Sequence, residues 1–162
     1  MTETVSHIAL RPVGSQYFDM LTGVEFGEDQ GCLWVKGQVT NNKRVQTNDL
    51  IKITSQQSFQ WLGRKDNVIN SGGIKIYPEQ VEIVISEALH NNDISLAFYL
   101  GKENDSQLGE KLVMYVEGNV DSKKVYDIIR PKITALHSKH HVPRNIRDGM
   151  KFKRTESGKI IR

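Results

Sequence analysis

The chain of 162 residues carries 22 Lys and Arg against 19 Asp and Glu, and 38% of its residues are hydrophobic. This length and composition allow one ordinary domain, or one small domain with part of another, and exclude wholesale disorder. The single cysteine, Cys32, excludes an internal disulfide and a cysteine-based metal site. No apolar run is long enough to span a bilayer and no signal peptide is visible, so we expect a cytoplasmic protein without membrane insertion.

Charge is spread unevenly along the chain. The net charge of +3 is too small to indicate a nucleic-acid partner, but residues 139–162 hold eight Lys or Arg against Asp148 and Glu156. This segment is either a solvated surface or a site for a polyanion such as a nucleotide or a phosphate, and composition leaves both readings open.

Residues 1–66 are predicted to be rich in β-strands. Apolar and polar residues alternate over residues 33–36, 50–53 and 59–62, and clusters of Gly, Asn and Asp separate these runs. Short strands joined by turns favour a small antiparallel sheet or barrel.

The pattern changes to helical spacing after Gly72 and Gly73. Pro78 suits the first position of a helix. The apolar face of this predicted helix would hold Val81, Val84, Ile85, Ala88 and Leu89. Strands are expected at residues 94–100 and 111–116, so the second part of the chain is predicted to be α+β.

A second helix is predicted to begin after Asp121, which suits the N-cap. We expect a kink or a split at Pro131, because proline removes a helical hydrogen bond. The apolar face of this helix would hold Val125, Ile128, Ile129, Ile133 and Leu136.

Three histidines lie close together near the end of this second helix. His137 and His141 are one helical turn apart, but no carboxylate or cysteine accompanies them. We therefore predict exposed histidines, with His140 among them, and no metal site made by protein ligands alone.

Two segments carry the most specific patterns. Residues 63–82 read as a charged turn, a strand, the Gly72-Gly73 pair, a strand and a helix. A tight hairpin explains the glycines, which tolerate positive φ, but not the charges that flank them. The other segment, residues 152–162, contains Gly158-Lys159 and by itself is typical of a solvated tail.

Together these segments resemble the acyl-adenylate-forming (AMP-binding) superfamily of acyl-CoA synthetases, luciferases and peptide-synthetase adenylation domains. Gly63-Arg64-Lys65-Asp66 is similar to the segment that joins the large N-terminal domain of these enzymes to a small C-terminal lid. The resemblance implies that residues 1–64 end the large domain, residues 65–66 (Lys65 and Asp66) form the hinge, and residues 67–162 form the lid domain.

The resemblance also implies roles for single residues. Lys159 would be the catalytic lysine that bridges the substrate carboxylate and the α-phosphate of ATP. Asp49, in Thr47-Asn48-Asp49, and Arg64 would contact the ribose of ATP or AMP, although Asn48 stands where the family usually has glycine. Lys75, where many members have arginine, would face a phosphate.

Other matching positions concern CoA and the metal. Gly72 and Gly73 would lie beside the channel for the pantetheine of CoA. Thr2 would contact the α-phosphate, and Glu3 would help to hold the Mg²⁺ that accompanies ATP. The implied substrates are a small-molecule carboxylate, ATP and CoA.

The resemblance covers only the last part of such an enzyme, and the family's phosphate-binding loop is not among the 162 residues. We therefore expect the rest of the N-terminal domain to be needed and the isolated chain to be inactive. Residues 1–11 and 70–73 look most like o-succinylbenzoate–CoA ligases of menaquinone biosynthesis. The alternatives are a generic fatty or aryl acid–CoA ligase, and a non-catalytic module that binds nucleotide or nucleic acid; the oligomeric state is not predicted.

Overall fold

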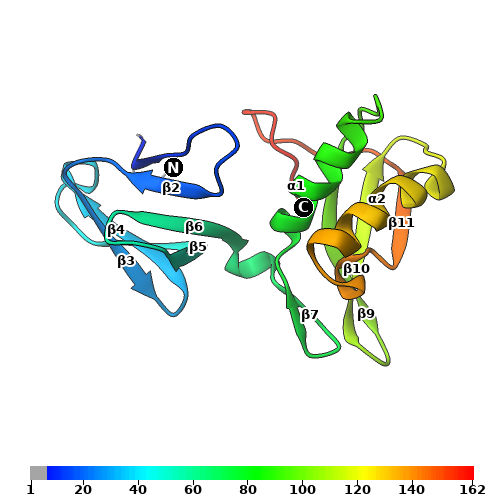
Figure 1. Cartoon of the computed structure of the whole chain (residues 1–162), viewed down its shortest axis with the longest axis horizontal. Coiled ribbons are helices and arrows are strands. Elements are labelled where there is room, and N and C mark those ends of the chain that lie inside the picture. Colours follow the sequence, from blue (N-terminus) through cyan, green and yellow to red (C-terminus); the bar gives the residue numbers. More distant parts are fainter. Residues whose placement is uncertain (1–6) are drawn as a thin grey trace. The chain divides into compact units, whose positions relative to one another are not determined.

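The computed structural model describes residues 7–162 (Figure 1). Contacts within the chain divide it after Asp66 into two compact units, each of which is described by itself. Among residues 7–162, no helix is long and apolar enough to cross a membrane.

The first unit is an open antiparallel sheet of six strands, in the order β1-β2-β6-β5-β4-β3. The prediction of a small antiparallel sheet is confirmed. The strands are β1 (Ala9–Leu10), β2 (Tyr17–Met20), β3 (Val24–Asp29), β4 (Cys32–Gly37), β5 (Val45–Ile53) and β6 (Ser58–Arg64), with a 3-10 turn at Gln38–Thr40.

The core of this sheet is small and partly aromatic. Leu33, Val35 and Ile51 are buried, and the rings of Phe18 and Phe59 stack with centroids 5.5 Å apart. The β5–β6 ladder is interrupted near its end, where Leu50 pairs with residue 63 but the next residue of β5 pairs with residue 61. This bulge increases the local twist of the strands just before the units divide.

The second unit is α+β, as the sequence predicts. Its strands are β7 (Ile69–Ser71), β8 (Ile74–Ile76), β9 (Phe98–Asp105), β10 (Gly109–Glu117) and β11 (Asn145–Met150), and its helices are α1 (Pro78–His90) and α2 (Ser122–Leu136). Short 3-10 turns occupy Lys65–Asn67 and Lys139–His141. Strand β10 pairs antiparallel with β9 and with β7, and parallel with β11, which follows α2 in the chain.

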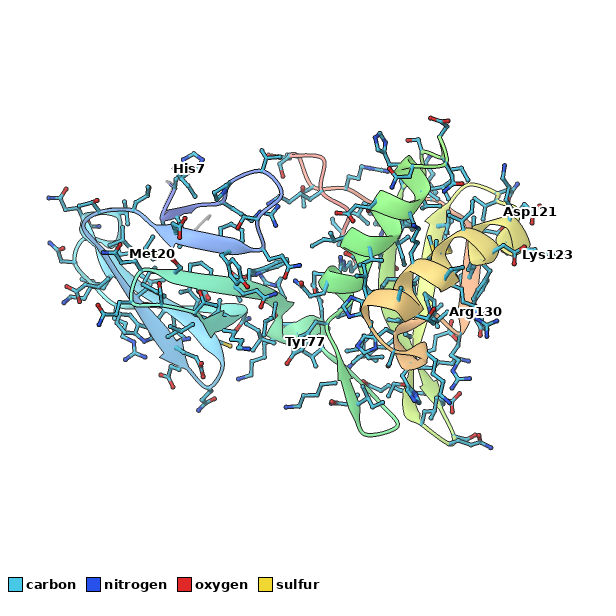
Figure 2. The ribbon with its side chains drawn as sticks, viewed as in Figure 1. His7, Met20, Tyr77, Asp121, Lys123 and Arg130 are labelled. Atoms are coloured by element: carbon cyan, nitrogen blue, oxygen red, sulfur yellow. The ribbon has the colours of Figure 1, made fainter. Side chains whose placement is uncertain are left out.

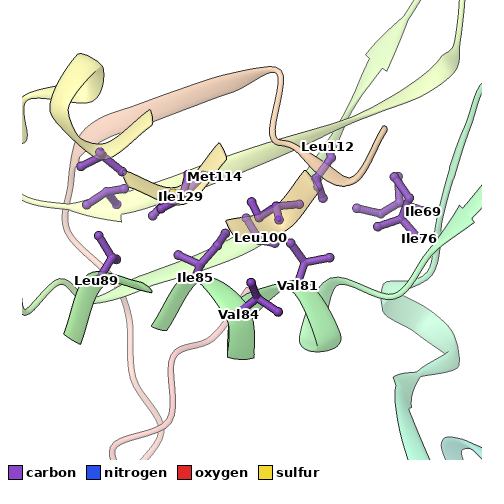
Figure 3. Packing of buried hydrophobic residues seen from close by; sticks show 13 residues of the cluster. Ile69, Ile76, Val81, Val84, Ile85, Leu89, Leu100, Leu112, Met114 and Ile129 are labelled. Atoms are coloured by element: carbon purple, nitrogen blue, oxygen red, sulfur yellow. The ribbon is translucent and has the colours of Figure 1, made fainter. Parts of the chain in front are cut away.

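Both helices lie over one face of this sheet (Figure 1). All five apolar positions predicted for α1 are buried. Four of them, Val81, Val84, Ile85 and Leu89, belong to one core cluster with residues of β9, β10 and α2 such as Leu100, Met114 and Ile129 (Figure 3). The predicted cap of α2 is also confirmed, because Asp121 Oδ1 accepts a hydrogen bond from the backbone N–H of Lys124 at 3.1 Å. Asp121 is labelled beside the helix in Figure 2.

Three predictions for the second unit need correction. Of the kink or split expected at Pro131, the split is wrong: Val125, Ile129 and Ile133 are buried on both sides of it, and α2 is one continuous helix. Leu136 is 67% exposed, because the helix ends at this residue and its side chain passes beyond the core. The strand expected from residue 94 begins only at residue 98.

Candidate functional site

Asp49 and Arg64, the two predicted ribose contacts, are directly opposite each other on β5 and β6. Thr47 is buried and fixes this end of β5 by donating to the carbonyl of Leu33 at 2.8 Å and accepting from the N–H of Asp49 at 3.1 Å. The carboxylate of Asp49 accepts from the indole Nε1–H of Trp61 at 3.2 Å. One carboxylate oxygen is therefore oriented by the sheet, and the other could accept a hydrogen bond from a ligand hydroxyl.

A cavity of about 390 Å³ opens beside Asp49 in the first unit. Among residues 7–162, its lining is mostly apolar, and the only carboxylate in it is that of Asp49. A ligand with an apolar part and a hydroxyl group suits this mixture of apolar wall and carboxylate acceptor. The lining residues are His7, Ile8, Ala9, Phe18, Leu33, Asp49, Phe59 and Trp61.

Asp66, the predicted hinge residue, is tied back to the end of the sheet. Its Oδ2 accepts from Arg64 Nη2 and from Asn48 Nδ2, both at 3.2 Å. Asn48 is therefore more than a substitute for a family glycine, because its amide donates to the predicted hinge residue. Lys65, the other predicted hinge residue, is exposed.

Gly72 and Gly73 form the two-residue turn between β7 and β8, as the hairpin prediction requires. Their φ angles of 59° and 82° lie in the left-handed region, which suits a type I′ hairpin. A Cβ on Gly72 would meet Leu108 Cδ2 at 3.0 Å, whereas a Cβ on Gly73 would meet nothing within 4 Å. Lys75 follows on β8, and its side chain is exposed.

Lys159 lies on a small turn that residues 153–161 form (the lysine loop). The N–H of Thr155 donates to the carbonyl of Lys159 at 2.8 Å, and the N–H of Lys159 donates to Thr155 Oγ1 at 3.1 Å. The N–H of Ile161 closes the base of the turn by donating to the carbonyl of Lys153 at 2.9 Å. The Lys159 side chain is exposed at the end of this turn.

Two ion pairs hold the lysine loop against the second unit. Before the turn, Arg154 donates to both oxygens of Glu117 on β10, at 2.9 and 2.5 Å. After the turn, Arg162 donates to both oxygens of Glu82 on α1, at 2.8 and 2.6 Å. Sequence reasoning named Lys159 and missed these four residues, although an arginine on each side of the lysine was a usable signal.

The remaining predicted residues have separate outcomes. Thr2 and Glu3 lie outside the described residues.

The three histidines near the end of α2 are half-buried rather than exposed. The rings of His137 and His141 stack with centroids 5.0 Å apart, and burial lowers the pKa of both. Within residues 7–162, no group of three or more His, Cys, Asp or Glu is placed to hold a metal ion.

The two ion pairs should respond differently to acid. Hydrogen bonds from Arg154 lower the pKa of Glu117 to about 2, so this pair stabilises the fold above pH 4.5 and loses its effect as the pH falls towards 2. Burial raises the pKa of Glu82 above 4.5, although the hydrogen bonds from Leu100 N–H and Arg162 oppose this shift. As the pH falls, Glu82 is therefore protonated, and its pair with Arg162 weakened, already above pH 4.5.

We therefore expect Glu82 to be protonated and Glu117 still ionised at pH 3. Carboxyl-carbon chemical shifts of the 162-residue chain, followed by NMR through an acid titration, measure both groups. Titration of the two carboxylates together near pH 4.5 would contradict the assigned environments.

Comparison with known proteins gives the class. No protein-family profile matches the sequence. The chain is 40% identical to an acyl-CoA synthetase (AMP-forming)/AMP-acid ligase II-like protein of Dyadobacter fermentans, with a TM-score of 0.54, covering 99% of this chain and 47% of that one. The sequence and structure neighbours thus point to an AMP-forming acid–CoA ligase, the class that the motifs resemble.

Within this class, one protein is found by both sequence and structure. The chain is 23% identical over 141 residues to the 2-succinylbenzoate–CoA ligase of Lactococcus lactis, covering 82% of this chain and 30% of that protein. It also matches the Bacillus subtilis o-succinylbenzoate–CoA synthetase in complex with its acyl-adenylate intermediate, at 23% identity and a TM-score of 0.78, over 100% of this chain and 39% of that one. The chain spans less than half the length of each of these three proteins.

Proposed function

We propose that this chain is the C-terminal part of an acid–CoA ligase that activates a carboxylate with ATP and passes the acyl group to CoA. The observation that carries the proposal is the lysine loop, which presents Lys159 at the end of a turn anchored on both sides. A freely solvated tail would not be held by an arginine–glutamate pair on each side of the lysine. The two ion pairs that hold the lysine loop also favour an enzyme over the non-catalytic nucleotide-binding module that the sequence left as an alternative.

In the first half-reaction, the substrate carboxylate attacks the α-phosphate of MgATP and releases pyrophosphate. Lys159 supplies a compact positive charge to the oxygens that gain charge in the transition state. Asp49 and Arg64 hold the ribose of the nucleotide, and Lys75 faces a phosphate. Thr2 and Glu3 complete this assignment, with Glu3 contributing to the site for the Mg²⁺ bound to ATP.

In the second half-reaction, the thiol of CoA attacks the acyl carbon of the adenylate and AMP leaves. We assign residues 1–64 to the large domain, residues 67–162 to the lid, and Lys65 and Asp66 to the hinge between them. Rotation about Asp66 withdraws Lys159 and brings Gly72 and Gly73 to the pantetheine channel. The open space around the Cβ position of Gly73 is consistent with a surface along which a chain-like substrate passes.

The carboxylate that we favour is o-succinylbenzoate, which places the enzyme in menaquinone biosynthesis. Support comes from the two relatives of that specificity and from the resemblance of residues 70–73. A fatty or aryl acid is the alternative within the class, because an acyl pocket is not recognisable in the 162 residues.

The test is an adenylation assay on an enzyme that contains these residues together with its N-terminal domain. We expect pyrophosphate release with o-succinylbenzoate to exceed that with a benzoate or a medium-chain fatty acid by at least tenfold. The 162-residue chain alone is expected to release none, because it contains no phosphate-binding loop. Preference for a fatty or aryl acid would refute the substrate, and turnover by the 162-residue chain would refute its role as one part of the catalytic unit.

A further inference from the structure

Arg162 directly follows the lysine loop, and its guanidinium lies between two carboxylates of helix α1. Arg162 Nη2 donates to both oxygens of Glu82, and Glu79 Oε1 lies 3.4 Å from Arg162 Nη1. The guanidinium also lies over the ring of Tyr99, 5.8 Å from its centroid. An arginine fixed on three sides has few alternative rotamers, so the backbone that carries it is fixed as well.

Glu79 is an unusual partner, because its residue is only 8% exposed. Its Oε1 accepts from Asn67 Nδ2 at 2.5 Å, while its Oε2 is buried without a hydrogen-bond partner among the described residues. A buried carboxylate with an unsatisfied oxygen is costly unless a positive charge is close. Arg162 is the only cation that forms an ion pair with Glu79 in the described part of the chain.

The contacts therefore form a continuous path from the hinge to the lysine. Asn67 directly follows Asp66 in the sequence, and its amide bonds to Glu79 in the second unit. Glu79 contacts Arg162, which is three residues beyond Lys159 and continues the strand-like segment that closes the turn.

We propose that Arg162 is a positioning residue, which Glu79 and Glu82 hold so that the lysine loop presents Lys159 in one fixed geometry. Asn67, the residue next to the hinge, supports Glu79 through its side-chain hydrogen bond. The proposal deepens the proposed function, on which it rests, because it assigns to three further residues the task of orienting the catalytic ammonium. Fixed orientation matters since a misplacement of about 1 Å reduces a reaction rate by about 10²-fold.

The first arm of the test measures the order of the loop in the 162-residue chain. We expect Arg162→Ala and Glu82→Gln to lower the NMR backbone order parameters of residues 155–161 from values typical of rigid backbone, about 0.85, to below about 0.6. Arg147→Ala is the control, because Arg147 also donates to both oxygens of a glutamate, Glu103, at 3.0 and 3.1 Å elsewhere in the same unit. Unchanged order in Arg162→Ala would overturn the proposal.

The second arm uses the enzyme that contains this chain. We expect Arg162→Ala to lower kcat for adenylation at least tenfold with little change in KM for ATP, and Arg162→Lys to recover part of the loss. Adding Arg162→Ala to Lys159→Ala should cause no further loss, because there is no ammonium left to position. Additive losses would show that Arg162 acts only through stability and would overturn the proposal.

The two arms also separate this inference from the function on which it rests. A wild-type enzyme that adenylates no acid refutes the proposed function, while the order parameters still decide whether Arg162 fixes the loop. An active enzyme whose adenylation rate does not change in Arg162→Ala refutes the positioning role and leaves the proposed function intact.

Discussion

Replacement of Lys159 by alanine is expected to slow acyl-adenylate formation about 10²- to 10³-fold in the enzyme that contains this chain. This is the loss typical of removing one group that stabilises charge in a transition state. Thioester formation from synthetic acyl-adenylate and CoA should be largely unaffected, because in our proposal the lid has by then withdrawn Lys159. Pyrophosphate release measures the first step, and CoA consumption measures the second.

Lys153→Ala is the control, since Lys153 is an exposed lysine at the base of the same loop that contributes its backbone carbonyl to the turn. Lys159→Arg should restore little activity, because a planar guanidinium does not replace a compact ammonium between two oxygens. Gly73→Trp should show the reverse pattern, with adenylation retained and thioester formation blocked. Loss of the same half-reaction in Lys159→Ala and Gly73→Trp would refute the two-conformation mechanism.

Replacement of Ile85 by alanine should reduce the free energy of unfolding of the second unit by about 2–5 kcal/mol, the range for removing a large buried aliphatic side chain. Ile85 is fully buried on α1, where it packs against the sheet and α2 (Figure 3). Its loss removes apolar burial and leaves a cavity that the neighbouring side chains fill only in part. Urea unfolding of the 162-residue chain, followed by circular dichroism, measures the change.

The matched control for this prediction is Ile83→Ala. Ile83 lies two residues earlier on the same helix, and 41% of it is exposed. Both substitutions give the same gain in helix propensity, so their difference isolates burial. We expect Ile83→Ala to change the unfolding free energy by less than about 1 kcal/mol, as is usual for surface positions. Equal losses in the two variants would contradict the assigned core.

Local patterns in the sequence determined the elements of the second unit. The spacing of apolar residues fixed the buried face of α1, because a helix with 3.6 residues per turn brings those positions to one side. The Gly72-Gly73 pair predicted the β7–β8 turn, and Asp121 predicted the start of α2. The resemblance of two short motifs was sufficient to indicate the class that the comparisons support.

Only the tertiary structure decided what lies around these elements. The path of α2 through Pro131 depends on burial of its apolar side chains, which outweighs the lost hydrogen bond. The half-burial of the histidines depends on packing that their spacing does not reveal.

The support of Lys159 likewise comes from residues that are far away in sequence. Arg154 and Glu117 are 37 residues apart, and Arg162 and Glu82 are 80 apart. No local pattern links such positions, because their pairing follows from how α1, β10 and the lysine loop are brought together by the shared core. The sequence therefore indicated which lysine is the candidate for catalysis, and the fold decided which side chains hold its loop in place.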